Sequence, residues 1–247
     1  MLIGSCFEPP EFSIIPSIKI EGVRVKEVAG ANTPDSLIVT INFKDGDGNI
    51  GVDGTETNPP FNERWHFLTS PRATCEPGVK APCTKISYID TNNIDDYVTY
   101  KFRRTSADYD TLPEYTSPFD CTNYYVLINS AGPSPVTIDT FYMQLNPRYS
   151  NLFMDLYVKS GATFNKFNFN QFVSNCEVHG LNGRLPVLAK DKDFDNKLPL
   201  EGTITYKILS TSFYAQLANK TLKVKIRIMD RDGNTSNEDE SNEFTLK

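Results

Sequence analysis

Runs in which apolar and polar residues alternate one by one recur along most of the chain. Ile18–Lys26 and Leu37–Phe43 alternate cleanly, and Leu222–Ile228 repeats the pattern near the C-terminus. Successive side chains of a β-strand point to opposite faces, so a period of two predicts strands with one buried face. Further strand-like runs are Val98–Arg103, Tyr124–Ile128, Val136–Met143, Leu152–Val158, Phe164–Phe172, Thr203–Leu209 and Glu243–Leu246. We therefore expect an all-β fold.

One internal repeat organises these strands. Leu37–Gly51 aligns without gaps on Leu222–Ser236, and each segment is an alternating strand that runs into Asp-x-Asp-Gly-Asn. The ending Arg227–Asn237 followed by Glu243–Leu246 resembles the closing F–G hairpin of bacterial immunoglobulin-like domains. We interpret the two repeats as strands B and F of one immunoglobulin-like β-sandwich. The remaining assignments are Ile18–Lys26 for A, Leu152–Val158 for C, Phe164–Phe172 for C′, Arg184–Leu188 for D and Thr203–Leu209 for E.

This scheme sets the expected domain organisation. Residues 1–16 form an N-terminal tether, residues 17–247 form the sandwich, and a large insertion occupies residues 53–145 between strands B and C. The alternative is two tandem β-sandwich domains, covering residues 17–132 and 133–247. A length of 247 residues accommodates either arrangement.

Charge and hydropathy exclude two classes of protein. The chain has 25 Lys and Arg against 31 Asp and Glu, and its net charge is −6. A duplex-binding protein normally shows a clustered basic surface, and no basic run occurs in this sequence. No apolar stretch reaches the roughly 18 residues that span a bilayer. We therefore expect neither a nucleic-acid partner nor an integral membrane protein.

The N-terminal run Ile3-Gly4-Ser5-Cys6 resembles a bacterial lipobox, in which the cysteine becomes diacylated. The segment after it contains Pro9, Pro10 and Pro16, a composition typical of an extended tether. The resemblance implies a lipid anchor on Cys6 and a place at the bacterial outer membrane, facing the cell surface or the periplasm. The alternative is an unstructured tail with a free cysteine.

The number of cysteines is consistent with an exported protein. Without Cys6 four cysteines remain, an even number that suits two disulfides and an oxidising compartment. Cys75 and Cys83 flank a short loop that contains a Pro-Gly turn, which favours their pairing, and Cys121 with Cys176 would be the other bond. Four cysteines allow three connectivities, so the other two stay open.

Several motifs together resemble a family of uncharacterised bacterial outer-membrane lipoproteins. They are Pro9–Phe12, Asp35–Thr40, Asp45–Asn49, Gly183–Val187, Pro199–Tyr206 and Asp230–Asn234. The resemblance covers both ends and the C-terminal half of the chain but not the insertion. It implies location and fold, and by analogy a place beside an outer-membrane β-barrel that assembles proteins or imports nutrients.

The inventory of catalytic groups is small. His66 and His179 are the two histidines, and the sequence has no nucleophile elbow, phosphate-binding loop or zinc-protease motif. We expect no enzyme but an accessory binding subunit of an outer-membrane protein complex. The first alternative is a solute- or glycan-binding lipoprotein of a nutrient-uptake system, and the second is a hydrolase with an unrecognised site.

The two Asp-x-Asp-Gly-Asn turns suggest a metal site. In an immunoglobulin-like sandwich the B–C, D–E and F–G loops lie at the same end, so their acidic side chains should converge. Carboxylate and amide oxygens are the ligands that Ca²⁺ prefers. The candidate ligands are Asp45, Asp47, Asn49, Asp191, Asp193, Asp230, Asp232 and Asn234. The alternative is plain turn chemistry, in which these side chains bond their own backbone.

Two triplets, Asp35-Ser36-Leu37 and Asp110-Thr111-Leu112, resemble sites of bacterial periplasmic O-glycosylation. They make Ser36 and Thr111 candidate modification sites.

Overall fold

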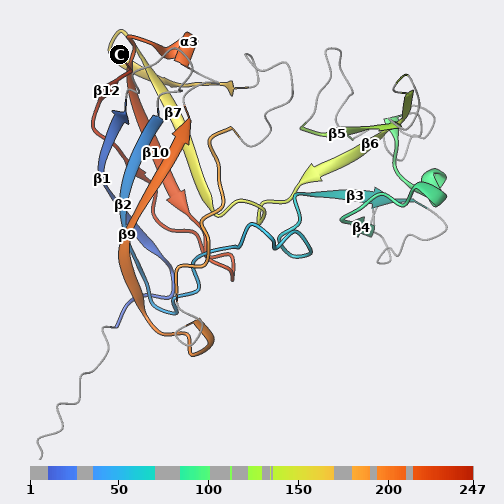
Figure 1. Cartoon of the computed structure of the whole chain (residues 1–247), viewed down its shortest axis with the longest axis horizontal. Coiled ribbons are helices and arrows are strands. Elements are labelled where there is room, and N and C mark those ends of the chain that lie inside the picture. Colours follow the sequence, from blue (N-terminus) through green and yellow to red (C-terminus); the bar gives the residue numbers. More distant parts are fainter. Residues whose placement is uncertain are drawn as a thin grey trace, which may run out of the picture. The chain divides into compact units, whose positions relative to one another are not determined.

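The computed structural model of the chain is all-β and contains two compact units (Figure 1). It describes residues 11–26, 36–69, 84–100, 112, 122–129, 134, 136–169, 180–189, 194–209 and 214–246. The first unit joins Met1–Thr55 to Ser150–Lys247, and the second is Glu56–Tyr149. The insertion expected at residues 53–145 covers most of the second unit, whereas the alternative boundary at residues 132 and 133 falls inside it.

Two antiparallel sheets form the first unit. The first sheet has the order β1-β2-β9, and the second has the order β11-β10-β7-β8, with β12 also paired to β10. Their bounds are β1 (Ser17–Lys26), β2 (Ser36–Asp45), β7 (Leu152–Ser160), β8 (Thr163–Lys166), β9 (Leu200–Leu209), β10 (Thr221–Ile228), β11 (Asp239–Glu240) and β12 (Phe244–Thr245). This is the A-B-E and G-F-C-C′ arrangement of an immunoglobulin-like sandwich, so the predicted fold class is confirmed.

Alternation in the sequence produces the sandwich core directly. On β10, Leu222, Val224, Ile226 and Ile228 are fully buried, and the lysine and arginine residues between them point away from the core. The inward residues of β2 meet them from the other sheet in the same apolar cluster. Leu217 of the short helix α3 (Tyr214–Leu217) and Leu246 also belong to this cluster. Burial of one face on each sheet therefore holds the two layers together.

The predicted strand D is wrong, because Arg184–Leu188 is an irregular segment. It follows an isolated bridge between Gly183 and Leu152. Pro186 lacks a backbone N–H for a ladder, and the side chain of Asn151 takes the place of a neighbouring strand. Asn151 accepts a hydrogen bond from the Leu185 N–H at 2.6 Å and donates to the Leu185 carbonyl at 3.2 Å.

Two other expected strands are described only in part. Of the run Phe164–Phe172, residues 164–166 belong to β8, which ends at Lys166, and the rings of Phe167 and Phe169 then pack edge to face with their centroids 4.8 Å apart. Of the run Val98–Arg103, residues 98–100 are described, and Thr99 forms an isolated bridge with Phe141. Residues 101–103 and 170–172 lie outside the described residues.

The second unit contains a four-stranded antiparallel sheet of order β4-β3-β6-β5. Its elements are β3 (Arg64–Leu68), β4 (Thr84–Ile86), the 3₁₀ helix η1 (Thr91–Asp96), β5 (Tyr124–Asn129) and β6 (Val136–Leu145). Two small aromatic clusters stabilise it. One contains Phe67, Tyr124 and Tyr142, and the other contains Tyr97 and Phe141.

None of the helices in the described part of the chain is long and apolar enough to cross a membrane. Cys6, Cys75, Cys83, Cys121 and Cys176 lie outside the described residues, so lipidation and disulfide pairing stay predictions.

Candidate functional site

Three carboxylates from two distant parts of the sequence meet at one end of the sandwich. Asp45 is the last residue of β2, Asp47 lies two residues later, and Asp230 follows β10. One oxygen from each lies within 4.8 Å of the other two. With metal–oxygen distances of about 2.3–2.6 Å, a single Ca²⁺ reaches oxygens separated by that distance.

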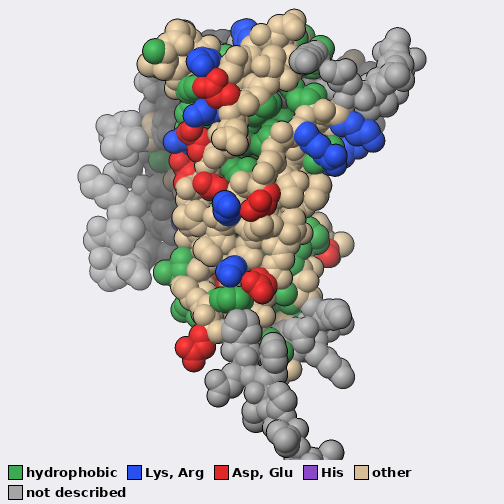
Figure 2. All heavy atoms as spheres, turned by 90° about the vertical axis from the view of Figure 1, so that its left-hand side faces the viewer, with side chains coloured by type: hydrophobic (Ala, Val, Ile, Leu, Met, Phe, Trp, Pro, Cys, Tyr) green, Lys and Arg blue, Asp and Glu red, His purple; other side chains and the backbone are tan. Residues whose placement is uncertain are grey.

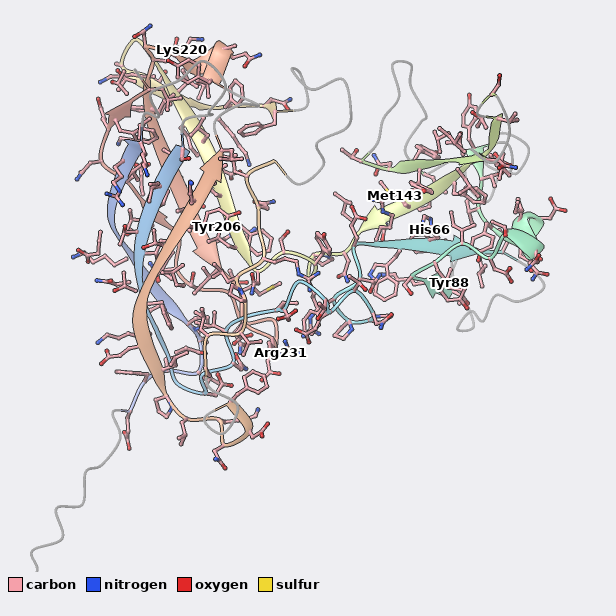
Figure 3. All side chains as sticks on the ribbon, in the orientation of Figure 1. His66, Tyr88, Met143, Tyr206, Lys220 and Arg231 are labelled. Carbon is pink, nitrogen blue, oxygen red and sulfur yellow. The ribbon has the colours of Figure 1, made fainter. Side chains whose placement is uncertain are left out.

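Turn chemistry brings the two loops together. Gly48 and Gly233 occupy the left-handed region with φ of 60° and 96°, which lets each chain turn sharply after its strand. The backbone N–H of Arg231 donates to the Asn49 carbonyl at 3.3 Å, and its guanidinium donates to the Gly51 carbonyl at 3.1 Å. Arg231 is labelled at this end of the sandwich in Figure 3. The repeated sequence motif therefore becomes a spatial pair of loops.

Several side-chain oxygens of the first loop are buried without a hydrogen bond of full geometry among the described residues. Asp45 is 0% exposed, and neither of its carboxylate oxygens has a hydrogen bond of full geometry in the described structure. The same is true of one oxygen on Asp47 and of the side-chain carbonyl of Asn49. Buried oxygens without donors are costly, and a cation satisfies them.

Electrostatics at the cluster disfavour three negative charges without a cation. Burial, together with the Asp47 and Asp230 carboxylates, raises the pKa of Asp45 to about 7, against the nearby backbone N–H of Asn49, which lowers it. Burial and the neighbouring carboxylates of Asp230 and Asp232 also raise the pKa of Asp47, while Lys197 lowers it. Without a metal, a proton must neutralise part of this charge near neutral pH.

Other predicted ligands surround the three carboxylates. The Asn49 amide donates to Asp47 at 3.0 Å and to Asp232 at 3.1 Å. Asp232 is more exposed, and its carboxylate lies 3.7 Å from the Lys197 ammonium. The backbone and side-chain N–H groups of Asn234 both donate to Asp230, at 2.8 and 2.7 Å. Asn234 thus orients Asp230, which is the turn role that the sequence also allowed.

The structure accordingly sorts the eight predicted ligands. Asp45, Asp47 and Asp230 come together with Asn49 beside them, Asp232 lies at the rim, and Asn234 supports Asp230. Asp191 and Asp193 lie outside the described residues. Lys197 belongs to the site and was not predicted. Its backbone has a positive φ of 51°, which the sequence gives no means to foresee for a lysine.

His66 lies in a different environment, in the second unit. It is 4% exposed, and its Nδ1 has no hydrogen bond among the described residues. Burial and the nearby Arg64 guanidinium lower its pKa to about 4, against the Tyr142 backbone carbonyl and Glu63, which raise it. The imidazole borders a cavity of about 490 Å³ whose lining also includes Tyr88 and Tyr125. Figure 3 labels His66 and Tyr88. Sequence reasoning missed this cavity, because its walls come from separate strands and loops.

The predicted glycosylation sites gain no support. Ser36 is 1% exposed at the start of β2, so its hydroxyl is not accessible in the folded chain, and Thr111 lies outside the described residues. His179 also lies outside them.

Comparison of the chain with family models, curated proteins and solved structures returns no match.

Proposed function

We propose that this protein is a calcium-binding, non-enzymatic binding module, in which one Ca²⁺ joins the loops after β2 and β10. The observation that carries the proposal is the fully buried carboxylate of Asp45, which lies beside Asp47 and Asp230 and whose oxygens have no hydrogen bond of full geometry among the described residues. The donor set consists of carboxylate and amide oxygens only, which favours a hard cation over a transition metal.

The ion would stabilise the end of the sandwich. The first loop also holds the start of the described chain, because the Gly46 N–H donates to the Ser13 carbonyl at 2.8 Å. A cation at Asp45 and Asp230 would therefore order both loops and the residues that precede β1. Such an ordered end offers a defined binding surface, which agrees with a role as an accessory subunit at an outer-membrane complex. That partner rests on the motif resemblance alone.

The test is thermal unfolding of the full chain in chelator and in millimolar Ca²⁺. A ligand that binds only the folded state at about 100 times its Kd adds about 2.7 kcal/mol to the free energy of unfolding, so Ca²⁺ should raise the Tm clearly. Asp45→Asn should abolish the rise. In chelator this variant should be at least as stable as the wild type, because it removes a buried charge.

Asp53→Asn is the matched control, because Asp53 lies in the same loop, outside the acidic cluster, and accepts hydrogen bonds from Thr55. It should keep the Ca²⁺-dependent rise in Tm. Calorimetric titration with Ca²⁺ and with Mg²⁺ measures affinity and selectivity directly. The proposal fails if wild-type protein shows neither heat of binding nor a change in Tm with Ca²⁺.

A further inference from the structure

In the described part of the chain, β9 is an outer strand of its sheet. It pairs with β2 along all ten residues, from Leu200 to Leu209, without a register shift. No other strand in the described part of the chain pairs with it, and no described side chain bonds its backbone. A long, regular edge of this kind is a template for pairing with another strand.

The opposite edge of the same sheet is blocked in two ways. β1 carries a bulge between Ile20 and Gly22. Side chains also occupy its backbone groups: the Ile18 N–H donates to Asn237 at 2.9 Å, and the Ile20 N–H donates to Asp239 at 2.6 Å. Bulges and covering side chains are devices that natural sheets use against edge pairing. The sheet therefore protects one edge and leaves β9 regular.

The sequence of β9 is complementary to itself when two copies run antiparallel about Ile204. On the outer face, Glu201 lies opposite Lys207 and Thr203 lies opposite Thr205, twice each because the pairing is symmetric. On the inner face, Gly202 lies opposite Tyr206, a pairing in which an aromatic ring covers a glycine. Directly opposed charges and threonine pairs stabilise antiparallel strands.

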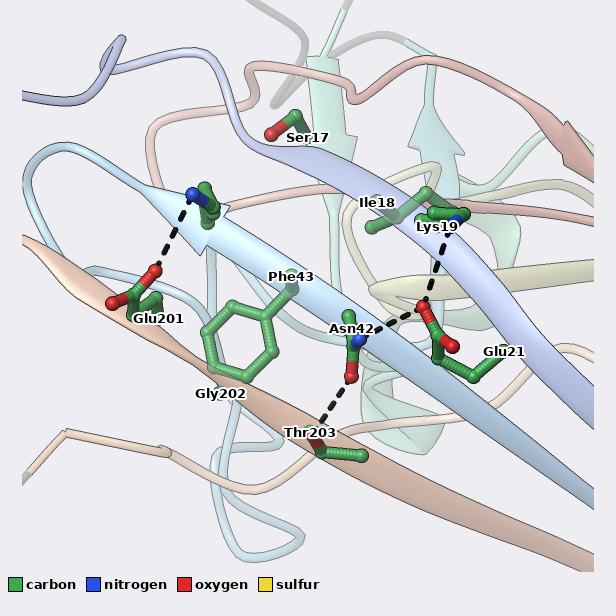
Figure 4. Close-up of a pocket in the computed structure, with 10 residues that line it drawn as sticks. Ser17, Ile18, Lys19, Glu21, Asn42, Phe43, Glu201, Gly202 and Thr203 are labelled. Atoms are coloured by element: carbon green, nitrogen blue, oxygen red, sulfur yellow. Dashed lines mark hydrogen bonds and ion pairs between the residues drawn. The ribbon is translucent and has the colours of Figure 1, made fainter.

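Charges on the outer face of the sheet fit this register. Glu201 forms an exposed ion pair with Lys44 at 3.5 Å, and Lys207 forms no ion pair among the described residues. Figure 4 shows the polar contacts that cross this face, including the hydrogen bond of 2.7 Å from Thr203 to Asn42. Figure 2 shows acidic and basic side chains interspersed on the side of the sandwich where β1 lies in Figure 1. Lys207 has no acidic ion-pair partner among the described residues, and in the proposed register Glu201 of a second β9 would supply one.

Apolar residues at the two ends of β9 also fit the antiparallel register about Ile204. Leu209 is 51% exposed at one end and Leu198 is 42% exposed just before the other. The antiparallel register places Leu209 opposite Pro199 of the second strand, next to its Leu198. A groove of about 470 Å³ also borders β9, lined in part by Pro186 and Leu188. Pairing would cover apolar surface that is otherwise left in water.

We propose that two copies of this chain associate through β9, antiparallel and with Ile204 on the two-fold axis. The two three-stranded sheets then form one continuous six-stranded sheet. The contact is isologous, so the same ten residues serve both subunits. This inference uses only the first unit and does not depend on the calcium site.

Sedimentation equilibrium of the full chain measures the association, at concentrations up to about 100 μM, where weak specific interfaces are occupied. The average mass should approach twice that of the monomer. Glu201→Lys and Lys207→Glu each place like charges opposite one another, so each variant alone should weaken dimerisation at least tenfold at low salt. The double variant, which exchanges the two charges, should restore the dimer.

Mixing the two single variants gives the sharpest test. A mixed pair has opposite charges at both contacts, so an equimolar mixture should dimerise although neither variant does so alone. Lys19→Glu on β1 is the control, because that exposed lysine lies on the protected edge, and it should leave the dimer unchanged. A wild-type monomer throughout the concentration range overturns the proposal. So does a dimer that neither charge reversal weakens while the Tm of the variants is unchanged.

Discussion

Asp45 and His66 are both buried ionisable side chains, and burial disfavours the charged form of each. It raises the pKa of the Asp45 carboxyl and lowers the pKa of the His66 imidazole. Their surroundings differ. Asp45 lies among other carboxylates whose repulsion a cation would relieve, whereas the Arg64 guanidinium beside His66 adds to the effect of burial. The carboxylate is therefore a metal-ligand candidate, and the lowered pKa keeps the imidazole neutral near pH 7.

His66 makes stability depend on pH in a defined direction. Its folded pKa of about 4 lies below its unfolded value of about 6.5, so below pH 6.5 the unfolded chain binds a proton that the folded chain excludes. The contribution of His66 to the free energy of unfolding should fall between pH 6.5 and pH 4, by on the order of 3 kcal/mol. The raised pKa of Asp45 changes the total free energy of unfolding in the opposite direction over the same range, so the His66 contribution is measured as a difference from a His66 variant. Fluorescence of Trp65, the single tryptophan, follows unfolding of the same strand.

His66→Gln should remove this contribution, so the difference in free energy of unfolding between wild type and variant should fall from pH 6.5 to pH 4, and His179→Gln is the matched control for the other histidine. Equal slopes for wild type and His66→Gln would show that His66 is accessible to protons in the folded state.

At the level of elements, Arg184–Leu188 shows how one segment can close a sandwich without becoming a strand. Leu185 packs into the sandwich core, and a few specific hydrogen bonds hold the backbone of this segment. The Leu185 carbonyl accepts from the Val52 N–H at 2.8 Å and from the Asn151 side-chain amide at 3.2 Å, and the Leu185 N–H donates to the Asn151 side-chain oxygen at 2.6 Å. The Leu188 N–H donates to Ile50 at 3.3 Å. A buried side chain therefore supplies hydrogen bonds that a strand partner would otherwise provide.

Asn151→Ala should destabilise the sandwich by about 2–4 kcal/mol, because it leaves the buried Leu185 N–H without an acceptor. Chemical denaturation of the full chain measures the change. Asn42→Ala is the control, since its hydrogen bonds to Glu21 and Thr203 lie on the exposed face, and it should cost less than about 1 kcal/mol. Equal costs for the two variants would contradict the role assigned to Asn151.

At the level of the whole molecule, the chain leaves the sandwich for the second unit and returns to it at one place. Val52 and Asn151, on either side of the second unit, both hydrogen-bond to Leu185. The two ends of the insertion are therefore close together, which is the arrangement in which domain insertions are tolerated. All the proposed calcium ligands lie in the first unit.

Replacing Glu56–Tyr149 with a short Gly/Ser linker should leave a folded sandwich, because the core of the first unit contains no residue of the deleted segment. The shortened chain should unfold cooperatively and keep the Ca²⁺-dependent rise in Tm. Calorimetry of the shortened and full chains makes the comparison. An unfolded or Ca²⁺-insensitive product would mean that the second unit supports the first.

The sequence by itself determined most strands of the sandwich and which of their faces is buried. Alternation along Leu222–Ile228 and Leu37–Phe43 sets which face is buried, and a period of two leaves little choice of register once one face is apolar. The Asp-x-Asp-Gly-Asn motif likewise predicts two turns with clustered oxygens, because glycine supplies the positive φ that such turns need.

Only the tertiary structure decided what those patterns became. Tertiary packing left Arg184–Leu188 irregular, since its partner groups come from Asn151, far away in the sequence. Tertiary packing also buried Asp45 beside Asp230 and placed Lys197 near the same cluster. No local sequence pattern specifies that these residues lie close together. Secondary structure follows from near neighbours along the chain. The burial of a side chain, its pKa and whether a sheet edge is covered depend on residues that meet only after folding.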